Sequence, residues 1–197
     1  FDHNFASVKS AIVNDKIGDV HVLKITSRDP EPPPVSYVKV SGGIFYDMVV
    51  HDFDMARFLV DSEVTEVFAT ATVKVDEAIG AAGDWDTAIV TLKFENGAIG
   101  VIDASRKAVY GYDQRVEVFG SKGSVAIGND TLSTAVISNA DGVTAEKPKF
   151  FFLERYMGAF TEEKKQFFDA IKNGADIPVG GFDGLMSVVI AEAAKRS

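Results

Sequence analysis

The sequence predicts an α+β protein with an open, mainly antiparallel sheet and helices packed on one face of that sheet. Three observations support this fold class. Residues 64–147 contain a succession of strand-like segments, and segments with helical spacing lie before and after them. The connections between the strand-like segments are mostly too short for helical crossovers, so neighbouring strands run antiparallel. Helices from both ends of the chain would then cover one face.

The N-terminal quarter is predicted to contain a helix, a strand and a second helix. Apolar residues recur at helical spacing over residues 4–17, with Asn4 as the N-cap and Gly18 as the C-cap. Val20–Ser27 alternates and is rich in β-branched residues, so it is predicted to be a strand. After a proline-rich loop, which is stiff because proline fixes φ, the spacing predicts a long helix over about 44–60.

The remaining elements follow from strand patterns, turn residues and helix ends. The predicted strands are Val64–Val75, Asp86–Phe94, Ala98–Val109, Gln114–Phe119 and Ser124–Ile127. Asn96-Gly97 favours a tight hairpin, because a type I′ turn needs positive φ at both central residues. Residues 139–142 are a further turn. Helices are predicted over 151–173, with Gly174 as terminator, and over 183–196, with Asp183 at its start.

The composition excludes several classes of function. The chain has 197 residues and a formal net charge of −9, which argues against nucleic acid or an anionic membrane as partner. It has no cysteine, so a disulfide scaffold, a cysteine-ligated metal and a thiol nucleophile are excluded. Its length suits a single domain over residues 1–197. Because it begins with Phe1 and not with Met, we expect it to be part of a longer protein.

The stretch from Ser41 to Asp54 carries the candidate chemistry. Asp47 and His51 are four residues apart, so on a helix both side chains would project from one face, which Asp54 would extend. A carboxylate beside an imidazole orients the ring and makes histidine a competent general base near neutral pH. Gly42 and Gly43, just before the helix, would let a flat ligand or another backbone come close.

Two other interpretations of this stretch remain open. An Asp–His pair one turn apart is often a surface pair that contributes only about 0.2–0.5 kcal/mol. Its apolar neighbours, however, indicate a buried helix, where a charged stripe needs a reason. Alternatively, Asp47, His51 and Asp54 together would offer oxygen and nitrogen ligands to a divalent cation. The other two histidines lie on different predicted elements, so we expect no metal site.

Outside this stretch, the polar residues carry weaker signals. Tyr110, Tyr112 and Asp113 lie at a strand-to-strand junction, where they would either bind the hydroxyl groups of a polyol or decorate a hairpin. Gly180–Gly184 precedes a helix but lacks the strand and the spacing of a dinucleotide fingerprint. The remaining candidates are four arginines and a lysine: Arg28, Arg57, Arg106, Lys107 and Arg155. Of these, Arg28 and Arg57 are expected to be structural ion-pair partners.

Residues 42–54 resemble a family signature. They read Gly-Gly-Ile-Phe-Tyr-Asp-Met-Val-Val-His-Asp-Phe-Asp, and G-G-x-x-x-D-x-x-x-H-x-x-D is typical of the glucose–fructose oxidoreductase and inositol 2-dehydrogenase (Gfo/Idh/MocA) family. The likeness spans nearly the whole chain and is closest to inositol 2-dehydrogenases. Ser27 departs from it, because some of those enzymes place a substrate-facing histidine there. The supporting segments are residues 1–5, 18–21, 26–30, 110–113, 117–123 and 152–156.

The resemblance implies that residues 1–197 are the C-terminal substrate-binding and oligomerisation domain of a two-domain oxidoreductase. Family members begin with a Rossmann domain that binds NAD or NADP, followed by a Glu-Lys-Pro motif whose lysine contacts substrate and nicotinamide. Neither is in this chain, so the chain alone is expected to be inactive. The implied reaction is hydride transfer to the nicotinamide from a secondary alcohol of a cyclitol such as myo-inositol, or of another sugar.

The resemblance also implies roles for particular residues. His51 would take the hydroxyl proton, and Asp47 would orient and polarise the site. Gly42 and Gly43 are the candidate cofactor-binding residues. The candidates for contacts to substrate hydroxyls are Asp54, Tyr110 and Tyr112.

The expected assembly is a cytoplasmic homo-oligomer, a homotetramer, built through the free face of the sheet. The expected ligand is a small polyol or sugar, with neither nucleic acid nor membrane as partner. A competing hypothesis is a non-catalytic assembly or ligand-binding module, which the absence of a nucleotide fingerprint in the chain favours.

Overall fold

A six-stranded sheet in the order β2-β3-β4-β1-β5-β6 organises the computed structural model, which describes residues 1–197. Every pair of neighbouring strands is antiparallel except β1 and β4, which are parallel. The predicted open, mainly antiparallel sheet is therefore confirmed. Its strands are β1 (Val20–Arg28), β2 (Val64–Thr72), β3 (Thr87–Phe94), β4 (Ile99–Ser105), β5 (Asp113–Gly120) and β6 (Gly123–Ile127).

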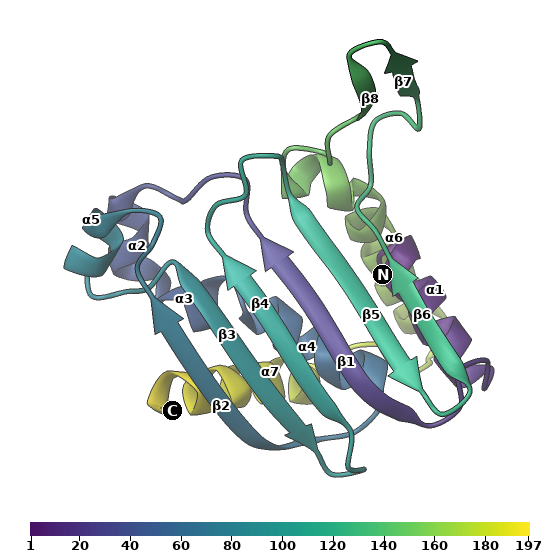
Figure 1. The fold of residues 1–197 in the computed structure, drawn as a ribbon. Coiled ribbons are helices and arrows are strands. Elements are labelled where there is room, and N and C mark those ends of the chain that lie inside the picture. The colour runs from purple at the N-terminus through teal and green to yellow at the C-terminus, as the bar shows by residue number, and fades with distance from the viewer.

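Most of the helices cover one face of this sheet and leave the other face open (Figure 1). The long helices lie behind the strands in that view, whereas α2 and α5 lie beyond one end of β2 and β3. The predicted one-sided layering is confirmed. The helices are α1 (His3–Val13), α2 (Val35–Ser41), α3 (Ile44–Asp47), α4 (Val50–Val60), α5 (Glu77–Ala81), α6 (Phe152–Asn173) and α7 (Gly181–Arg196).

The core lies between the sheet and the helices. Along β3, buried residues alternate with more exposed ones, so that Val90, Leu92 and Phe94 face the helices. Phe53 and Leu59 of α4 are completely buried in the same cluster. This period-2 burial is what a sheet with one covered face requires. No helix combines the length and the apolar character needed to cross a membrane.

Three predicted helix ends are wrong in detail. Asp2, not Asn4, caps α1, because its carboxylate accepts hydrogen bonds from the amides of Asn4 and Phe5 at 3.0 and 3.1 Å. The helix stops at Val13 and never reaches Gly18. At the start of α7, Asp183 lies inside the first turn and accepts from the amide of Gly180 at 2.8 Å.

The long helix predicted over 44–60 is interrupted, which corrects the expected geometry of the candidate site. The one-turn helix α3 ends at Asp47, and α4 begins at Val50. Between them the amide of Val49 donates to the carbonyl of Ile44 at 3.0 Å, and that of His51 to the carbonyl of Met48 at 3.4 Å. These five-residue and three-residue steps replace the regular four-residue pattern. Asp47 and His51 therefore do not share one regular helix.

A small hairpin projects from the body of the molecule. Its strands are β7 (Val136–Asn139) and β8 (Gly142–Ala145), and every residue in both is exposed. The turn predicted at residues 139–142 joins these strands. In Figure 1 the hairpin extends beyond the end of the sheet at which β5 begins.

Candidate functional site

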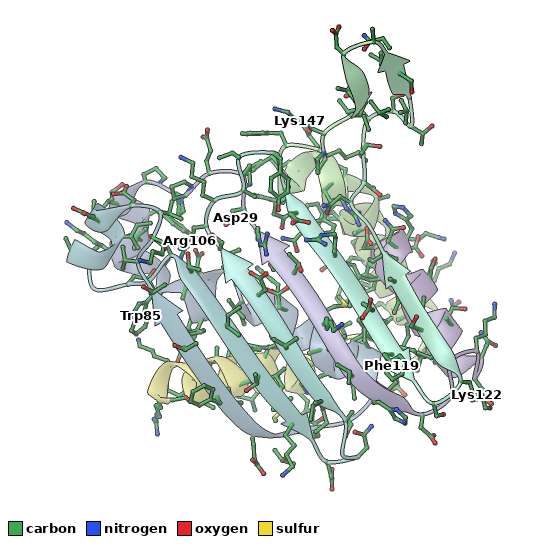
Figure 2. The ribbon with its side chains drawn as sticks, viewed as in Figure 1. Asp29, Trp85, Arg106, Phe119, Lys122 and Lys147 are labelled. Atoms are coloured by element: carbon green, nitrogen blue, oxygen red, sulfur yellow. The ribbon has the colours of Figure 1, made fainter.

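The candidate site lies at the edge of the sheet where β1 and β4 end. Because these two strands are parallel, their carboxyl ends meet at one edge. Asp29 follows β1 and Arg106 follows β4, and Figure 2 shows both just beyond the tips of the two arrows. The backbone fixes them there: the amide of Asp29 donates to the carbonyl of Ser105 at 2.9 Å, and the amide of Ala108 donates to the carbonyl of Asp29 at 2.6 Å.

Asp47 reaches this edge from the end of α3. Its carboxylate accepts a hydrogen bond from the guanidinium of Arg106 at 2.9 Å and one from the hydroxyl of Tyr37 at 2.6 Å. The expected pairing of Asp47 with His51 is wrong in this structure, because the carboxylate is already occupied by the arginine and the phenol. The side chain of Asp47 is 15% exposed, so an edge of it remains accessible.

His51 lies in the first turn of α4 and is exposed. None of the side-chain hydrogen bonds or ion pairs of the chain involves its imidazole, in contrast to His3, which lies 3.6 Å from the carboxylate of Asp2. A positive charge on the imidazole of His51 lowers the pKa of the Asp54 carboxyl, because it stabilises the ionised carboxylate. An imidazole with no partner in the chain can accept a proton from a bound molecule.

Two carboxyls, the half-buried Asp29 and the buried Asp52, lie beside this site. Burial raises the pKa of Asp29 to about 6; the charge of Arg106 opposes the rise and that of Asp47 reinforces it. Burial also raises the pKa of Asp52, to about 7. The negative charge of Asp29 adds to this rise, whereas a hydrogen bond from the hydroxyl of Ser27 lowers the pKa of Asp52. One carboxyl oxygen of Asp52 is buried without a hydrogen-bond partner. Neighbouring acids with raised pKa values are typical of functional sites.

Of the two candidate tyrosines, the structure brings only Tyr112 to this group. Tyr112 packs edge-on against Tyr156 of α6, with ring centroids 5.9 Å apart. Burial raises its pKa, and the charges of Asp29 and Asp52 add to the effect. Its phenol is therefore a neutral hydrogen-bonding group near the buried acids.

Tyr110 and Asp54 lie elsewhere, which corrects their expected grouping with Asp47. The hydroxyl of Tyr110 donates to Asp113 at 2.6 Å and accepts from Arg28 at 3.1 Å, on the uncovered face of the sheet. Asp54 faces α7, where the hydroxyl of Ser187 lies 3.5 Å from its carboxylate. Burial and the charge of Asp183 raise the pKa of Asp54.

Gly42 and Gly43 are explained by the turn between α2 and α3. Both have φ in the left-handed region, at 93° and 94°, which favours glycine. A Cβ on Gly43 would lie only 2.8 Å from a carboxylate oxygen of Asp84. Gly43 therefore allows Asp84 to approach the start of α3, whereas Gly42 is exposed and leaves its backbone accessible.

The alternative of a metal site finds no support in the side-chain arrangement. Asp47, His51 and Asp54 do not converge, and no group of three or more His, Cys, Asp or Glu side chains in the structure has the geometry to hold a metal ion.

Sequence reasoning missed three acids of this site. In the sequence, Asp29 belongs to the proline-rich loop and to the family-like segment 26–30, Asp52 belongs to the signature, and Asp84 belongs to no motif. For Asp52 a signal existed, because an acid flanked by the apolar side chains of a buried helix is unusual. For Asp29 and Asp84 no local signal existed, since their surroundings come from residues 47 and 106, far along the chain.

Fold and site together define a class of protein: a one-sided α+β domain with acids and an arginine gathered at one sheet edge. The family model for the GFO/IDH/MocA C-terminal domain matches residues 5–126. The chain belongs to this family. The resemblance seen in residues 42–54 is thereby confirmed.

Several of the relatives are named as inositol dehydrogenases. The chain is 54% identical over 197 residues to myo-inositol 2-dehydrogenase of Thermotoga maritima and 49% identical to inositol 2-dehydrogenase of Rhizobium meliloti. It also superposes on scyllo-inositol dehydrogenase of Lactobacillus casei, a structure with bound NAD(H) and scyllo-inositol, with a TM-score of 0.90 at 28% identity over 100% of this chain. All of this chain is matched in each case, but it spans only 59–60% of these relatives.

Proposed function

We propose that residues 1–197 are the substrate-binding and oligomerisation domain of an NAD-dependent inositol 2-dehydrogenase. The observation that supports this most strongly is the similarity to myo-inositol 2-dehydrogenase at 54% identity over all 197 residues of this chain. In addition, His51 is exposed and the side chain of Asp47 is partly exposed. The relatives are longer than this chain, and we assign the binding of NAD mainly to the part of the protein that corresponds to their additional length. Use of NADP and a cytoplasmic location stay predictions.

The proposed reaction converts a secondary alcohol into a ketone. His51 accepts the hydroxyl proton, because its imidazole is exposed and has no partner in the chain. Asp47 accepts a hydrogen bond from a neighbouring hydroxyl of the substrate on the edge left free by Arg106 and Tyr37, and so orients the reacting carbinol. A bound nicotinamide would supply the acceptor for the hydride that leaves the carbinol carbon.

Further residues contribute to binding in this proposal. Tyr112 offers a neutral phenol to a substrate hydroxyl, since burial and nearby acids keep its proton on. The accessible backbone at Gly42 is the remaining candidate for contact with the cofactor, as Gly43 is used by Asp84. Tyr110 and Asp54 are not included, because their side chains are engaged elsewhere.

The test is an activity assay on the protein expressed at its full encoded length. We expect NAD⁺ reduction with myo-inositol or scyllo-inositol and much less with glucose. His51→Ala should lower kcat by about 10²-fold or more, the range for loss of a general base. His21→Ala is the matched control, because His21 is an exposed histidine on β1 that packs edge-on against Phe119, 5.9 Å away. If His51→Ala kept most of the wild-type rate, the assignment of the base would be wrong.

The open face of the sheet is the proposed oligomer interface. A shallow hollow of about 330 Å³ lies between Phe68, Lys93 and Ile99 on that face. Phe68 is 62% exposed and Ile99 is 53% exposed, and a soluble monomer rarely gathers such side chains in one patch. Ion pairs lie on the same face, such as Lys24 with Glu117 at 2.8 Å. A second copy of the chain would bury this mixed surface.

A further inference from the structure

Arg106 is a deeply buried charged side chain near the site. It is 1% exposed and follows the last residue of β4. Its guanidinium donates to Asp47 at 2.9 Å and to Asp84 at 3.4 Å. Its backbone amide donates to the carbonyl of Asp86 at 2.8 Å, so its position is fixed by the chain itself. Removing a cation from water costs several kcal/mol unless its partners are well placed.

The two carboxylates that bind Arg106 hold opposite ends of α3. Asp84 accepts a hydrogen bond from the amide of Ile44, the first residue of α3, at 3.0 Å. Asp47 is the last residue of α3. A helix of four residues does not form by itself, because nucleation is unfavourable and few hydrogen bonds follow it. One arginine thus ties the start and the end of α3 to the end of β4.

The same guanidinium influences a third acid. Its charge opposes the rise in the pKa of Asp29 that burial causes, while Asp47 reinforces that rise. The cation is therefore placed among Asp29, Asp47 and Asp84, on three different segments of the chain. Such an arrangement fixes the directions in which the carboxylates lie from Arg106 as well as their distances, because the guanidinium is planar and its donors diverge at set angles.

We propose that Arg106, anchored by Asp84, is a positioning residue that aims the carboxylate of Asp47 at a substrate hydroxyl and sets its separation from His51. This inference rests on the proposed function. His51 belongs to α4, beyond the interruption at Met48 and Val49, so the hydrogen bonds of one regular helix do not fix its separation from Asp47. Without the arginine, Asp84 would still hold Ile44 at the start of α3, but no charged side chain would hold Asp47 at its end.

The test compares Arg106→Lys with Arg57→Lys in the protein at its full encoded length. Arg57 is a matched control, because it is 9% exposed and also binds two acids, Glu63 at 2.6 Å and Asp183 at 3.3 Å, on the other side of α4. Lysine is a point charge and cannot hold two carboxylates in a fixed fork. We expect Arg106→Lys to lower kcat for myo-inositol at least 10-fold, with the KM for NAD⁺ changed less than twofold.

Arg106→Ala should lower kcat a further 10-fold, so that lysine at this position gives partial rescue. Arg57→Lys should leave kcat within twofold of the wild-type value. All variants are compared at a temperature where they are folded. Equal kcat values for Arg106→Lys and Arg57→Lys, in a wild-type protein that oxidises inositol, would overturn the positioning role and leave the proposed function intact. A wild-type protein that oxidises no polyol would overturn both.

Discussion

Asp52 is the residue whose environment differs most from that of an ordinary aspartate. It is 6% exposed, one of its oxygens has no hydrogen-bond partner, and burial raises its pKa to about 7. A charged carboxylate in such a place would be destabilising, so the folded protein binds a proton that the unfolded chain releases above its ordinary pKa of 3.8. The pKa of Asp29 is likewise raised, to about 6, so the folded protein also retains the proton of this carboxyl above its ordinary pKa.

Asp52→Asn should therefore change the dependence of stability on pH. In the wild type, the contribution of this proton is present below pH 3.8 and is lost as the pH rises through about 7. Asparagine has no proton to lose, so the variant should gain roughly 2–3 kcal/mol relative to wild type between pH 5 and pH 8, at about 1.4 kcal/mol per unit. Urea unfolding of the wild type and of Asp52→Asn at pH 5 and pH 8 measures the free energy of unfolding of each protein. If the difference between the two proteins were the same at both pH values, the prediction would be contradicted.

At the scale of elements, the junction of α2, α3 and α4 decides where the functional side chains lie. Gly42 and Gly43 turn the chain with positive φ, and the interruption at Met48–Val49 separates Asp47 from the regular part of α4. Asp84 then binds the amide of Ile44 across the gap that Gly43 leaves. The glycine pair is thus used for close approach of a side chain within the fold.

Gly43→Ala tests this junction against a glycine in open space. Gly43 and Gly97 have similar φ, 94° and 88°, but a Cβ at Gly97 would meet nothing within 4 Å. Alanine in the left-handed region costs about 1–2 kcal/mol by itself. We expect Gly97→Ala to lower the free energy of unfolding by that amount. Gly43→Ala should lower it by roughly twice as much, because the added Cβ at residue 43 would displace Asp84. Thermal unfolding of the two variants gives the comparison, and equal losses would count against the role of Asp84.

At the scale of the whole molecule, one helical layer leaves two apolar surfaces without cover. One is the open face of the sheet around Phe68 and Ile99. The other is on α6, whose large exposed apolar side chains are Phe152, Leu153, Met157, Phe167, Phe168 and Ile171. The sheet face is the surface that we proposed above for contact with a second copy of the chain.

Ile99→Lys should weaken self-association through the sheet face. The side chain is 53% exposed at the edge of the shallow hollow, so a lysine there would place a charge inside the proposed interface without disturbing the core. Val40→Lys is the control, because Val40 is 80% exposed on α2, away from the sheet face. Sedimentation velocity should show smaller species for Ile99→Lys only. If both variants sediment as the wild type does, the interface lies elsewhere.

The sequence alone determined the strands, the hairpin around Asn96-Gly97, the helix ended by Gly174 and the family signature, because alternation, turn residues and motif spacing are local properties. The turn type expected for that hairpin is wrong, since Gly97 has positive φ and Asn96 does not. Only the tertiary structure decided the partners of Asp47 and the raised pKa values of Asp29 and Asp52. The physical reason is that Arg106 comes from a strand end 59 residues away from Asp47. Burial and charge depend on such long-range neighbours, and nothing in the spacing of residues 42–54 encodes them.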